Sequence, residues 1–222
     1  MHHVLMTGGS GGIGEAIRIA LEEESFLVSN IGRQKADIRC DLADTKTLTK
    51  RVSAWLKTNK IDVLINCAGF GIFDPHETIK PECLEELIAV NLTAPLVLSH
   101  LCLKEFKRQG KGHIINMASI EATRHARFSA AYTATKAGLR DFSLALFEET
   151  RSSNIRVSCI NPDMTMTPFF EELRFSPSDE SETHIDPETI AQTVLFILKN
   201  PSVVCDITLR SPRFGIVKKP CK

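Results

Sequence analysis

Three side chains that can exchange or stabilise a proton lie close together between residues 116 and 140. Tyr132, the only tyrosine of the chain, is followed by Lys136 at position i+4, and Ser119 lies upstream of both. Apolar residues recurring three and four apart after Tyr132 predict a helix, and positions i and i+4 share one helical face. The phenol and the ammonium can therefore address the same small volume.

The chemistry of these side chains suits proton transfer to or from a carbonyl or alcohol oxygen. A phenol has an ordinary pKa of about 10, and a cation beside it lowers that pKa toward the range of a general acid–base group. Ser119, at the end of a predicted strand over 112–119, could hydrogen-bond the same oxygen. A Tyr-x-x-x-Lys pair can equally be a solvent-exposed pair on a helix surface, so the rest of the chain must decide.

A glycine-rich loop, TGGSGGIG at residues 7–14, separates the first predicted strand (4–7) from a predicted helix. Gly8, Gly12 and Gly14 would let the backbone turn tightly and approach a pyrophosphate, with the helix N-terminus facing the anion. The same spacing could also be no more than a tight turn. Its place between a strand and a helix indicates a dinucleotide site.

The end of the second predicted strand (26–31) is where the adenosine ribose of a dinucleotide would arrive. An acidic residue there typically holds the 2′-hydroxyl of NAD, but this chain has Gly32 and Arg33, with Lys35 nearby. A guanidinium suits a 2′-phosphate, so we expect NADP(H) to be preferred, with NAD(H) as the other candidate. The alternative is that Arg33 simply faces solvent.

Two turns that follow later strands could also lie against a cofactor, one beside the adenine and one beside the ribose. Taken alone, each could be an ordinary turn after a buried strand. The residues concerned are Asp41 and Leu42, after the third strand (37–42), and Asn66, Ala68 and Gly69, after the fourth (62–66).

A proline inside the long predicted helix at 81–108 marks a further candidate. Pro95 has no N–H, and its ring crowds the carbonyl of Asn91, so we expect a kink there. The unpaired Asn91 carbonyl must find another partner. It could anchor an ordered water next to Lys136, at the start of a proton path to solvent, or it could be only a simple proline kink.

Composition places the chain among ordinary globular proteins. Of 222 residues, 43% are apolar and 24% charged, and the 27 basic residues balance the 27 acidic ones, so no nucleic-acid or membrane partner is indicated. The cysteines are scattered without metal-ligand spacing, which favours reduced thiols and no metal site. The first residues pass directly into a strand without a basic, apolar leader, and we expect a cytoplasmic protein.

Strands and helices alternate along the chain, which predicts a doubly wound α/β fold of the Rossmann type, with a parallel sheet of about seven strands. The connection from Ile31 to Asp37 is too short for a full crossover helix, so that helix should be reduced or missing. We expect one domain over residues 1–210 and assign no role to the basic tail at 211–222. The remaining predicted strands are 156–161 and 203–209, and another helix is predicted at 187–200.

Together these motifs resemble the short-chain dehydrogenase/reductase family. The loop at 7–14 is similar to its cofactor loop. Residues 66–69, Asn-Cys-Ala-Gly, are similar to its Asn-Asn-Ala-Gly turn with the second Asn replaced. The resemblance covers roughly residues 3–210. The catalytic tetrad of the family is matched in order and spacing by Asn91, Ser119, Tyr132 and Lys136.

The resemblance implies a role for each member of the tetrad. Tyr132 would be the general acid–base, Ser119 would orient the reacting oxygen, and Asn91 would position a relay water. Lys136 would hold the nicotinamide ribose and lower the tyrosine pKa, while a hydride moves between nicotinamide C4 and a carbonyl carbon. The residues expected to bind the cofactor are Thr7, Gly8, Ser10, Gly12, Ile13, Gly14, Arg33, Asp41, Leu42, Asn66, Ala68, Gly69, Tyr132, Lys136, Thr165 and Thr167.

The chain departs from the family after the sixth strand, where Pro-Gly is replaced by Pro162-Asp163. A carboxylate could therefore sit near the nicotinamide or turn outward. Thr165 and Thr167 fall where the family contacts the carboxamide and phosphates. An apolar lid over the substrate, or simple helix packing, is the expectation for Phe169, Phe170, Leu173 and Phe175.

Two hypotheses follow. The first is an NADP-preferring carbonyl reductase or alcohol dehydrogenase acting on a small molecule, as a homodimer or homotetramer by resemblance. The second is a non-catalytic dinucleotide-binding sensor or scaffold of the same fold. The complete Asn-Ser-Tyr-Lys set favours the first, because a sensor has no need of a tuned phenol.

Overall fold

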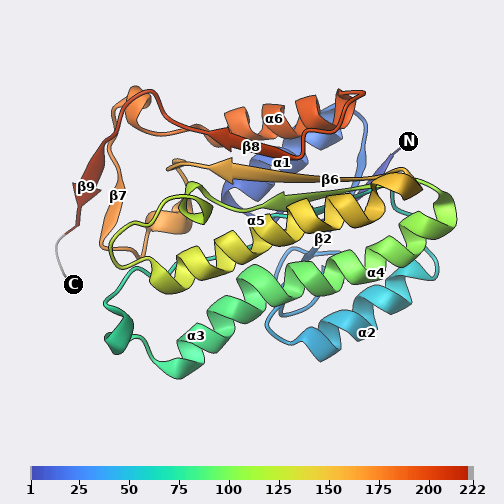
Figure 1. Cartoon of the computed structure of the whole chain (residues 1–222), viewed down its shortest axis with the longest axis horizontal. Coiled ribbons are helices and arrows are strands. Elements are labelled where there is room, and N and C mark those ends of the chain that lie inside the picture. Colours follow the sequence, from blue (N-terminus) through green and yellow to red (C-terminus); the bar gives the residue numbers. More distant parts are fainter. Residues whose placement is uncertain (1, 220–222) are drawn as a thin grey trace.

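The computed structural model describes residues 2–219, and its centre is a seven-stranded sheet in which every pair of neighbouring strands is parallel. The strand order is β3-β2-β1-β4-β5-β6-β8, so the chain winds outward in both directions from β1 (Figure 1). This confirms the predicted doubly wound α/β fold. The strands are β1 (His3–Thr7), β2 (Leu27–Gly32), β3 (Ile38–Arg39), β4 (Val63–Asn66), β5 (Gly112–Met117), β6 (Ile155–Pro162) and β8 (Asp206–Leu209).

Helices cover both faces of this sheet (Figure 1). Successive residues of a strand point to opposite faces, and β1 shows the result: Val4 and Met6 pack in the core beneath α1 and α6, whereas Leu5 packs in the core beneath α2, α4 and α5. Because neighbouring strands are parallel, their carboxyl ends lie together at one edge of the sheet. The helices are α1 (Gly12–Glu23), α2 (Thr45–Leu56), α4 (Ala94–Gln109), α5 (Ala130–Thr150) and α6 (Pro187–Lys199).

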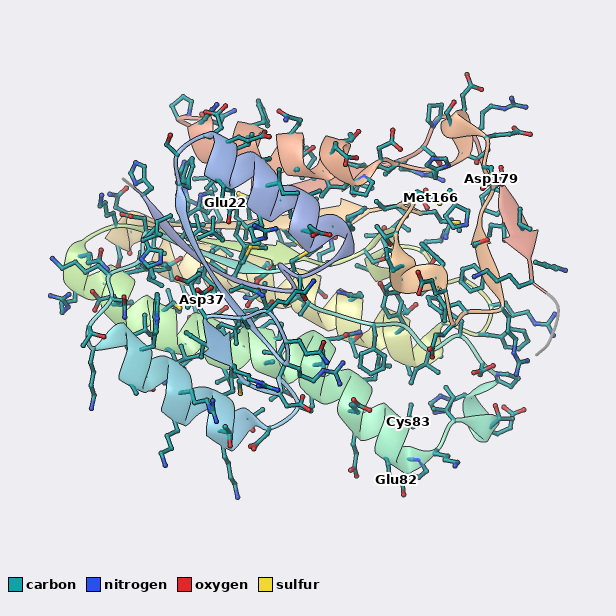
Figure 2. All side chains as sticks on the ribbon, turned by 180° about the vertical axis from the view of Figure 1, so that it is seen from behind. Glu22, Asp37, Glu82, Cys83, Met166 and Asp179 are labelled. Atoms are coloured by element: carbon teal, nitrogen blue, oxygen red, sulfur yellow. The ribbon has the colours of Figure 1, made fainter. Side chains whose placement is uncertain are left out.

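The connection between β2 and β3 contains no helix, as its length predicted. Asn30 and Asp37 close it: the Asn30 N–H donates to Asp37 Oδ2 at 2.7 Å, and the Asp37 N–H donates to the Asn30 carbonyl at 3.0 Å. Asp37 marks this loop in Figure 2. The Asn30 side chain also accepts a hydrogen bond from the Gly9 N–H at 3.0 Å. One side chain thus ties the short connection to the glycine-rich loop.

The long predicted helix is divided into α3 (Pro81–Ile88), one π-helical turn (Ala89–Thr93) and α4. The Ala94 N–H donates to the Ala89 carbonyl in the wider turn. By length and composition alone, Pro81–Gln109 would be able to cross a membrane. Its buried residues Leu98 and Phe106 instead pack in the core beneath the sheet.

A second, two-stranded sheet was not expected from the sequence. β7 (Phe175–Pro177) pairs antiparallel with β9 (Ile216–Lys218), so the segment after β8 returns to the carboxyl edge of the main sheet (Figure 1). Residues 220–222 of the predicted tail lie outside the described residues. Short 3₁₀ turns complete the chain at His76–Thr78, Ile120–Ala122, Arg151–Ser153, Pro168–Phe170 and Ser181–Thr183.

Candidate active site

A cleft of about 990 Å³ runs along the carboxyl ends of the strands. The glycine-rich loop lines it together with residues from the segment after β6 and with Ile216 and Lys218 of β9, and Thr167 of that segment lies directly against Gly12. Met166 and Asp179, both on the chain after β6, are labelled in Figure 2. This volume lies at the upper end of the range for small-molecule sites, and the carboxyl edge of an open parallel sheet is where such sites form.

Ser119, Tyr132 and Lys136 meet in the middle of this cleft, and each is less than a tenth exposed. Ser119 lies two residues after the end of β5, and its Oγ accepts a hydrogen bond from the Glu121 N–H at 3.2 Å. Tyr132 and Lys136 lie one turn apart in α5. Lys136 Nζ donates to the Met117 carbonyl at 2.9 Å and lies 5.8 Å from the centre of the Tyr132 ring.

Burial controls the acidity of both α5 groups. It raises the pKa of Tyr132 to about 12, with the negative charge of Glu121 acting in the same direction and the hydrogen bond from Ser119 opposing it. Burial also lowers the pKa of Lys136 to about 8. In the free protein the pKa of the phenol is therefore raised and not lowered, contrary to the expectation from the spacing, because the effect of burial on the charged form is the largest one.

Asn91 does not line the cleft but supports its wall. Its side chain is fully buried, and it accepts a hydrogen bond from the Phe70 N–H at 3.0 Å and donates to the Phe70 carbonyl at 2.8 Å. Its amide also donates to the Thr135 hydroxyl at 3.3 Å. Asn91 thus fastens the turn after β4 to α5, close to Lys136.

The glycine-rich loop forms a cradle, and a side chain at its Gly8 or Gly14 would not fit. A Cβ at Gly14 would lie 2.1 Å from the Gly8 carbonyl oxygen, so the first turn of α1 packs directly against the loop. Both glycines line the cleft together with Ser10, Gly12 and Ile13. Thr7 lies behind the cradle instead: its hydroxyl accepts hydrogen bonds from the N–H groups of Cys67 and Ala68, each at 3.1 Å.

The turn after β4 approaches Asn91 and Lys136 closely. A Cβ at Gly69 would come within 3.1 Å of Asn91 Oδ1 and 3.3 Å of Lys136 Nζ. Gly69 and Ala68 line the cleft. Asn66 is buried beneath them and donates to Asn116 Oδ1 at 2.8 Å, so the structure gives it a supporting position.

The part of the cleft near β2 and β3 adjoins a cluster of arginines. Arg33 lines the cleft with Asp41 and Leu42. A second hollow of about 290 Å³ adjoins it, and there Arg39 from β3 and Arg51 from α2 join Arg33. Arg51 donates to the Arg39 carbonyl at 2.5 Å. The sequence did not suggest the two additional arginines, because neither belongs to a motif and only the fold brings them to Arg33.

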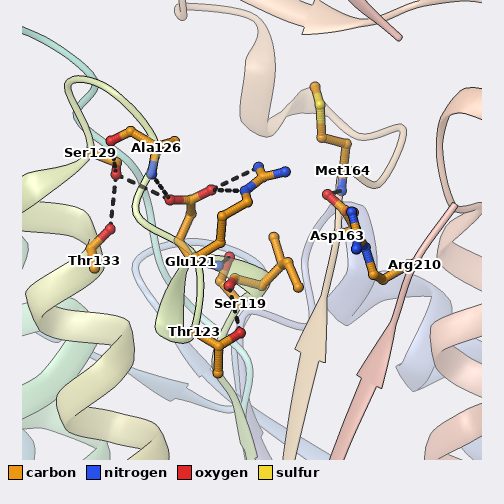
Figure 3. Close-up of polar contacts among 11 residues, drawn as sticks. Ser119, Glu121, Thr123, Ala126, Ser129, Thr133, Asp163, Met164 and Arg210 are labelled. Carbon is orange, nitrogen blue, oxygen red and sulfur yellow. Dashed lines mark hydrogen bonds and ion pairs between the residues drawn. The ribbon is translucent and has the colours of Figure 1, made fainter. Parts of the chain in front are cut away.

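The segment after β6 places Thr165 and Thr167 on the cleft wall. Asp163, at the position where glycine was expected, accepts a hydrogen bond from the Met164 N–H at 2.9 Å, and its Oδ2 lies 3.3 Å from Arg210 Nε (Figure 3). The carboxylate is thus paired with the residue that follows β8. The carboxylate that stands in place of the expected glycine is therefore directed toward Arg210.

Aromatic rings surround the phenol of Tyr132. Phe73 lies 5.1 Å and Phe169 6.1 Å from it, measured between ring centres, and Phe175 lies 5.1 Å from Phe73. Phe73 precedes α3 and was missed, since no motif marks it. Ile216 of β9 also lines this end of the cleft. Among residues 2–219, no group of three His, Cys, Asp or Glu side chains is arranged to hold a metal ion.

Residues 2–177 match the family model described as short chain dehydrogenase, and the chain belongs to this family of oxidoreductases. An uncharacterized oxidoreductase of Staphylococcus aureus (strain MW2) is 30% identical over 224 residues, covering 93% of this chain and 95% of the relative.

Two solved structures share the fold. A 3-ketoacyl-(acyl-carrier-protein) reductase from Brucella melitensis, complexed with NADH, has a TM-score of 0.83 at 24% identity and covers 95% of this chain and 97% of its own. An alcohol dehydrogenase from the archaeon Thermococcus sibiricus, complexed with 5-hydroxy-NADP, has the same TM-score, identity and coverage. These similarities extend over nearly the whole sheet and its helices.

Proposed function

We propose that this protein is an NADP(H)-preferring oxidoreductase that reduces a carbonyl group to an alcohol, with Tyr132 as the general acid. The observation that carries the proposal is the meeting of Ser119, Tyr132 and Lys136 in one cleft with the glycine cradle. The cradle suits a pyrophosphate because Gly8 and Gly14 leave no room for side chains and α1 begins beside it. The solved structures of the same fold hold NADH or 5-hydroxy-NADP.

The chain's own groups would complete the reaction around the carbonyl oxygen. A nicotinamide bound between the cradle and Lys136 would supply the hydride to the carbonyl carbon. The Ser119 Oγ accepts a hydrogen bond from the Glu121 N–H, and its single O–H, which can donate to the Tyr132 oxygen, would turn to donate to the substrate oxygen. Tyr132 then gives its proton to the same oxygen, and Lys136 stabilises the phenolate that remains.

The protonation state of the phenol favours the rate of one direction near neutral pH, although it does not change the equilibrium between carbonyl and alcohol. With a pKa of about 12, Tyr132 is protonated in the free protein and ready to act as an acid, whereas alcohol oxidation needs the phenolate. We therefore propose that carbonyl reduction is the faster direction near neutral pH.

The expected pH dependence differs between the two directions. Alcohol oxidation should rise about tenfold per pH unit, because the phenolate fraction rises by that factor well below the pKa. This applies between about pH 6 and 8, below the pKa of Lys136. Carbonyl reduction should stay nearly constant over the same range. Steady-state rates in both directions check this, and an oxidation rate that does not change with pH would contradict it.

The aromatic wall indicates the substrate class. Phe73, Phe169 and Phe175 surround the phenol with apolar surface, so we propose a ketone, aldehyde or quinone whose carbonyl carries an aromatic or bulky apolar group. A panel of such compounds, mixed with protein and NADPH, tests the function. Binding of NADPH without its oxidation by any member would favour the alternative, a dinucleotide-binding sensor.

The basic hollow supports the preference for NADP(H). Each hydrogen bond from a guanidinium to a phosphate contributes about 1.5–3 kcal/mol, equivalent to roughly 10- to 150-fold in affinity. We expect Arg33→Asp and Arg51→Ala each to lower the ratio of NADPH to NADH affinity by at least about tenfold. Arg151, exposed at the end of α5, serves as a matched control. Calorimetry with both cofactors measures the ratio, and an unchanged ratio in both variants would remove the hollow from the site.

We also propose that the protein forms a homo-oligomer and works in the cytoplasm. Half-buried apolar residues such as Leu101 on α4 and Phe142 on α5 favour pairing of these helices between two copies, giving a homodimer or homotetramer. The described cysteines are all free, which suits a reducing cytoplasm, while Cys221 lies outside the described residues.

A further inference from the structure

The loop from β5 to α5 contains a buried carboxylate that the proposed mechanism does not use. Glu121 is 4% exposed, although it lies only two residues after Ser119. A buried carboxylate is costly unless it is paired and hydrogen-bonded, so its partners show what its burial maintains.

The partners of Glu121 come from across the loop (Figure 3). Arg124 donates from Nε to Oε1 at 2.8 Å. Oε2 accepts hydrogen bonds from the Ala126 N–H at 3.0 Å and from the Ser129 hydroxyl at 3.1 Å. Ser129 immediately precedes α5, and with its proton directed to Glu121 its Oγ accepts a hydrogen bond from the Thr133 hydroxyl at 2.9 Å. Glu121 therefore connects Ser119, near the end of β5, to the first turn of the helix that carries Tyr132.

The hydrogen bonds of Glu121 to Ala126 and Ser129 lie on either side of a residue with a strained backbone. Phe128 has φ of +66°, a left-handed conformation that is unfavourable for a bulky side chain. The two groups bonded to Oε2, on Ala126 and Ser129, lie on either side of it in the chain. Phe128 and its neighbour Arg127 line the cleft. The carboxylate thus maintains an unfavourable backbone shape where a substrate would enter.

We propose, on the basis of the function proposed above, that Glu121 is a positioning residue that holds the Ser119 and Tyr132 hydroxyls side by side and acts on the phenol through its charge, which Arg124 balances. The N–H of Glu121 fixes the Ser119 Oγ, and its carboxylate fixes the start of α5. Other charged or titratable groups around this part of the cleft are Lys136 on α5, Cys67 after β4, Asp74 and Glu86 before and within α3, Asp163 after β6, Arg127 in the loop, and Arg174 and Lys218 at the rim.

The single tyrosine allows a direct test. Tyr132 is the only tyrosine of the chain, so the ultraviolet absorption of tyrosinate after a rapid pH jump reports its ionisation without any catalysis. Glu121→Gln removes a negative charge and keeps the side-chain shape, and it should lower the titration midpoint by about one pH unit. Arg124→Gln leaves the carboxylate unbalanced and should raise the midpoint.

Glu105 and Arg108 on α4 form a pair with the same i, i+3 spacing outside the cleft, so Glu105→Gln and Arg108→Gln are matched controls with no expected shift. Glu121→Gln should also lower the turnover number for carbonyl reduction by about tenfold, with the KM for NADPH unchanged. Opposite midpoint shifts support the proposal. Unchanged midpoints, or shifts in the same direction, overturn it.

Thermal melts of each variant identify loss of folding, and if Glu121→Gln does not fold, the direction of the Arg124→Gln shift decides alone. The titration needs no substrate. Its outcome is therefore separate from a failure of the proposed function, which would show as an undiminished rate in Tyr132→Phe.

Discussion

Replacing Tyr132 with phenylalanine should lower the turnover number for carbonyl reduction by about two to four orders of magnitude, the usual contribution of a general acid. The phenyl ring keeps its packing against Phe73 and Phe169 and loses only the hydroxyl. The developing alkoxide then loses the general acid that would protonate it. Stopped-flow measurement of NADPH oxidation gives the rate.

The affinity of Tyr132→Phe for NADPH should remain within a few-fold of the wild-type value, because the glycine cradle and the basic hollow are untouched. Fluorescence titration measures this affinity on the same preparation. A turnover number within tenfold of wild type would remove the phenol from the chemistry. A comparable loss of cofactor affinity would show instead that the variant disturbs the fold of the cleft.

Replacing Lys136 with alanine should damage both turnover and cofactor binding. The ammonium is buried beside Gly69, donates to the Met117 carbonyl and lies near the phenol, so no water can replace it easily. Loss of a charge-assisted hydrogen bond to the nicotinamide ribose would weaken NADPH binding by about 10- to 100-fold. Loss of the charge near the phenolate would lower the turnover number by a similar or larger factor.

Lys107, exposed near the end of α4, provides the control for the Lys136 experiment, since Lys107→Ala removes the same charge far from the cleft. Calorimetry with NADPH and single-turnover kinetics separate binding from chemistry. Wild-type cofactor affinity in Lys136→Ala would contradict the ribose-binding role. A reduced affinity with full turnover at saturation would contradict the role beside the phenolate.

The local sequence pattern was sufficient to predict the α/β fold of this protein. Continuous Val/Ile/Leu runs separated by helical segments predict a parallel sheet, and its strands end at one edge whatever their order. Ser119 ends one strand and Tyr132 and Lys136 share a helical face, so their meeting depends on short-range geometry. The absence of a helix between β2 and β3 followed from chain length alone.

Features that depend on distant contacts could not be predicted in the same way. β7 and β9 pair across about forty residues of chain, and three-residue strands have no periodicity to detect. Arg39 and Arg51 reach Arg33 only after α2 has packed against the sheet. The pKa of Tyr132 was predicted to fall, but it is raised in the free protein. The sequence shows the neighbouring cation but not the burial of both groups.

The most direct test of the central claim uses NADPH carrying deuterium at the transferable position of nicotinamide C4 and an aryl ketone that the protein reduces. We predict that wild-type protein places the deuterium on the carbinol carbon of the alcohol, and that Tyr132→Phe, saturated with the same cofactor, forms almost none of this product. Oxidation of NADPH without deuterium in the alcohol, or labelled alcohol formed by Tyr132→Phe at the wild-type rate, would contradict the proposal.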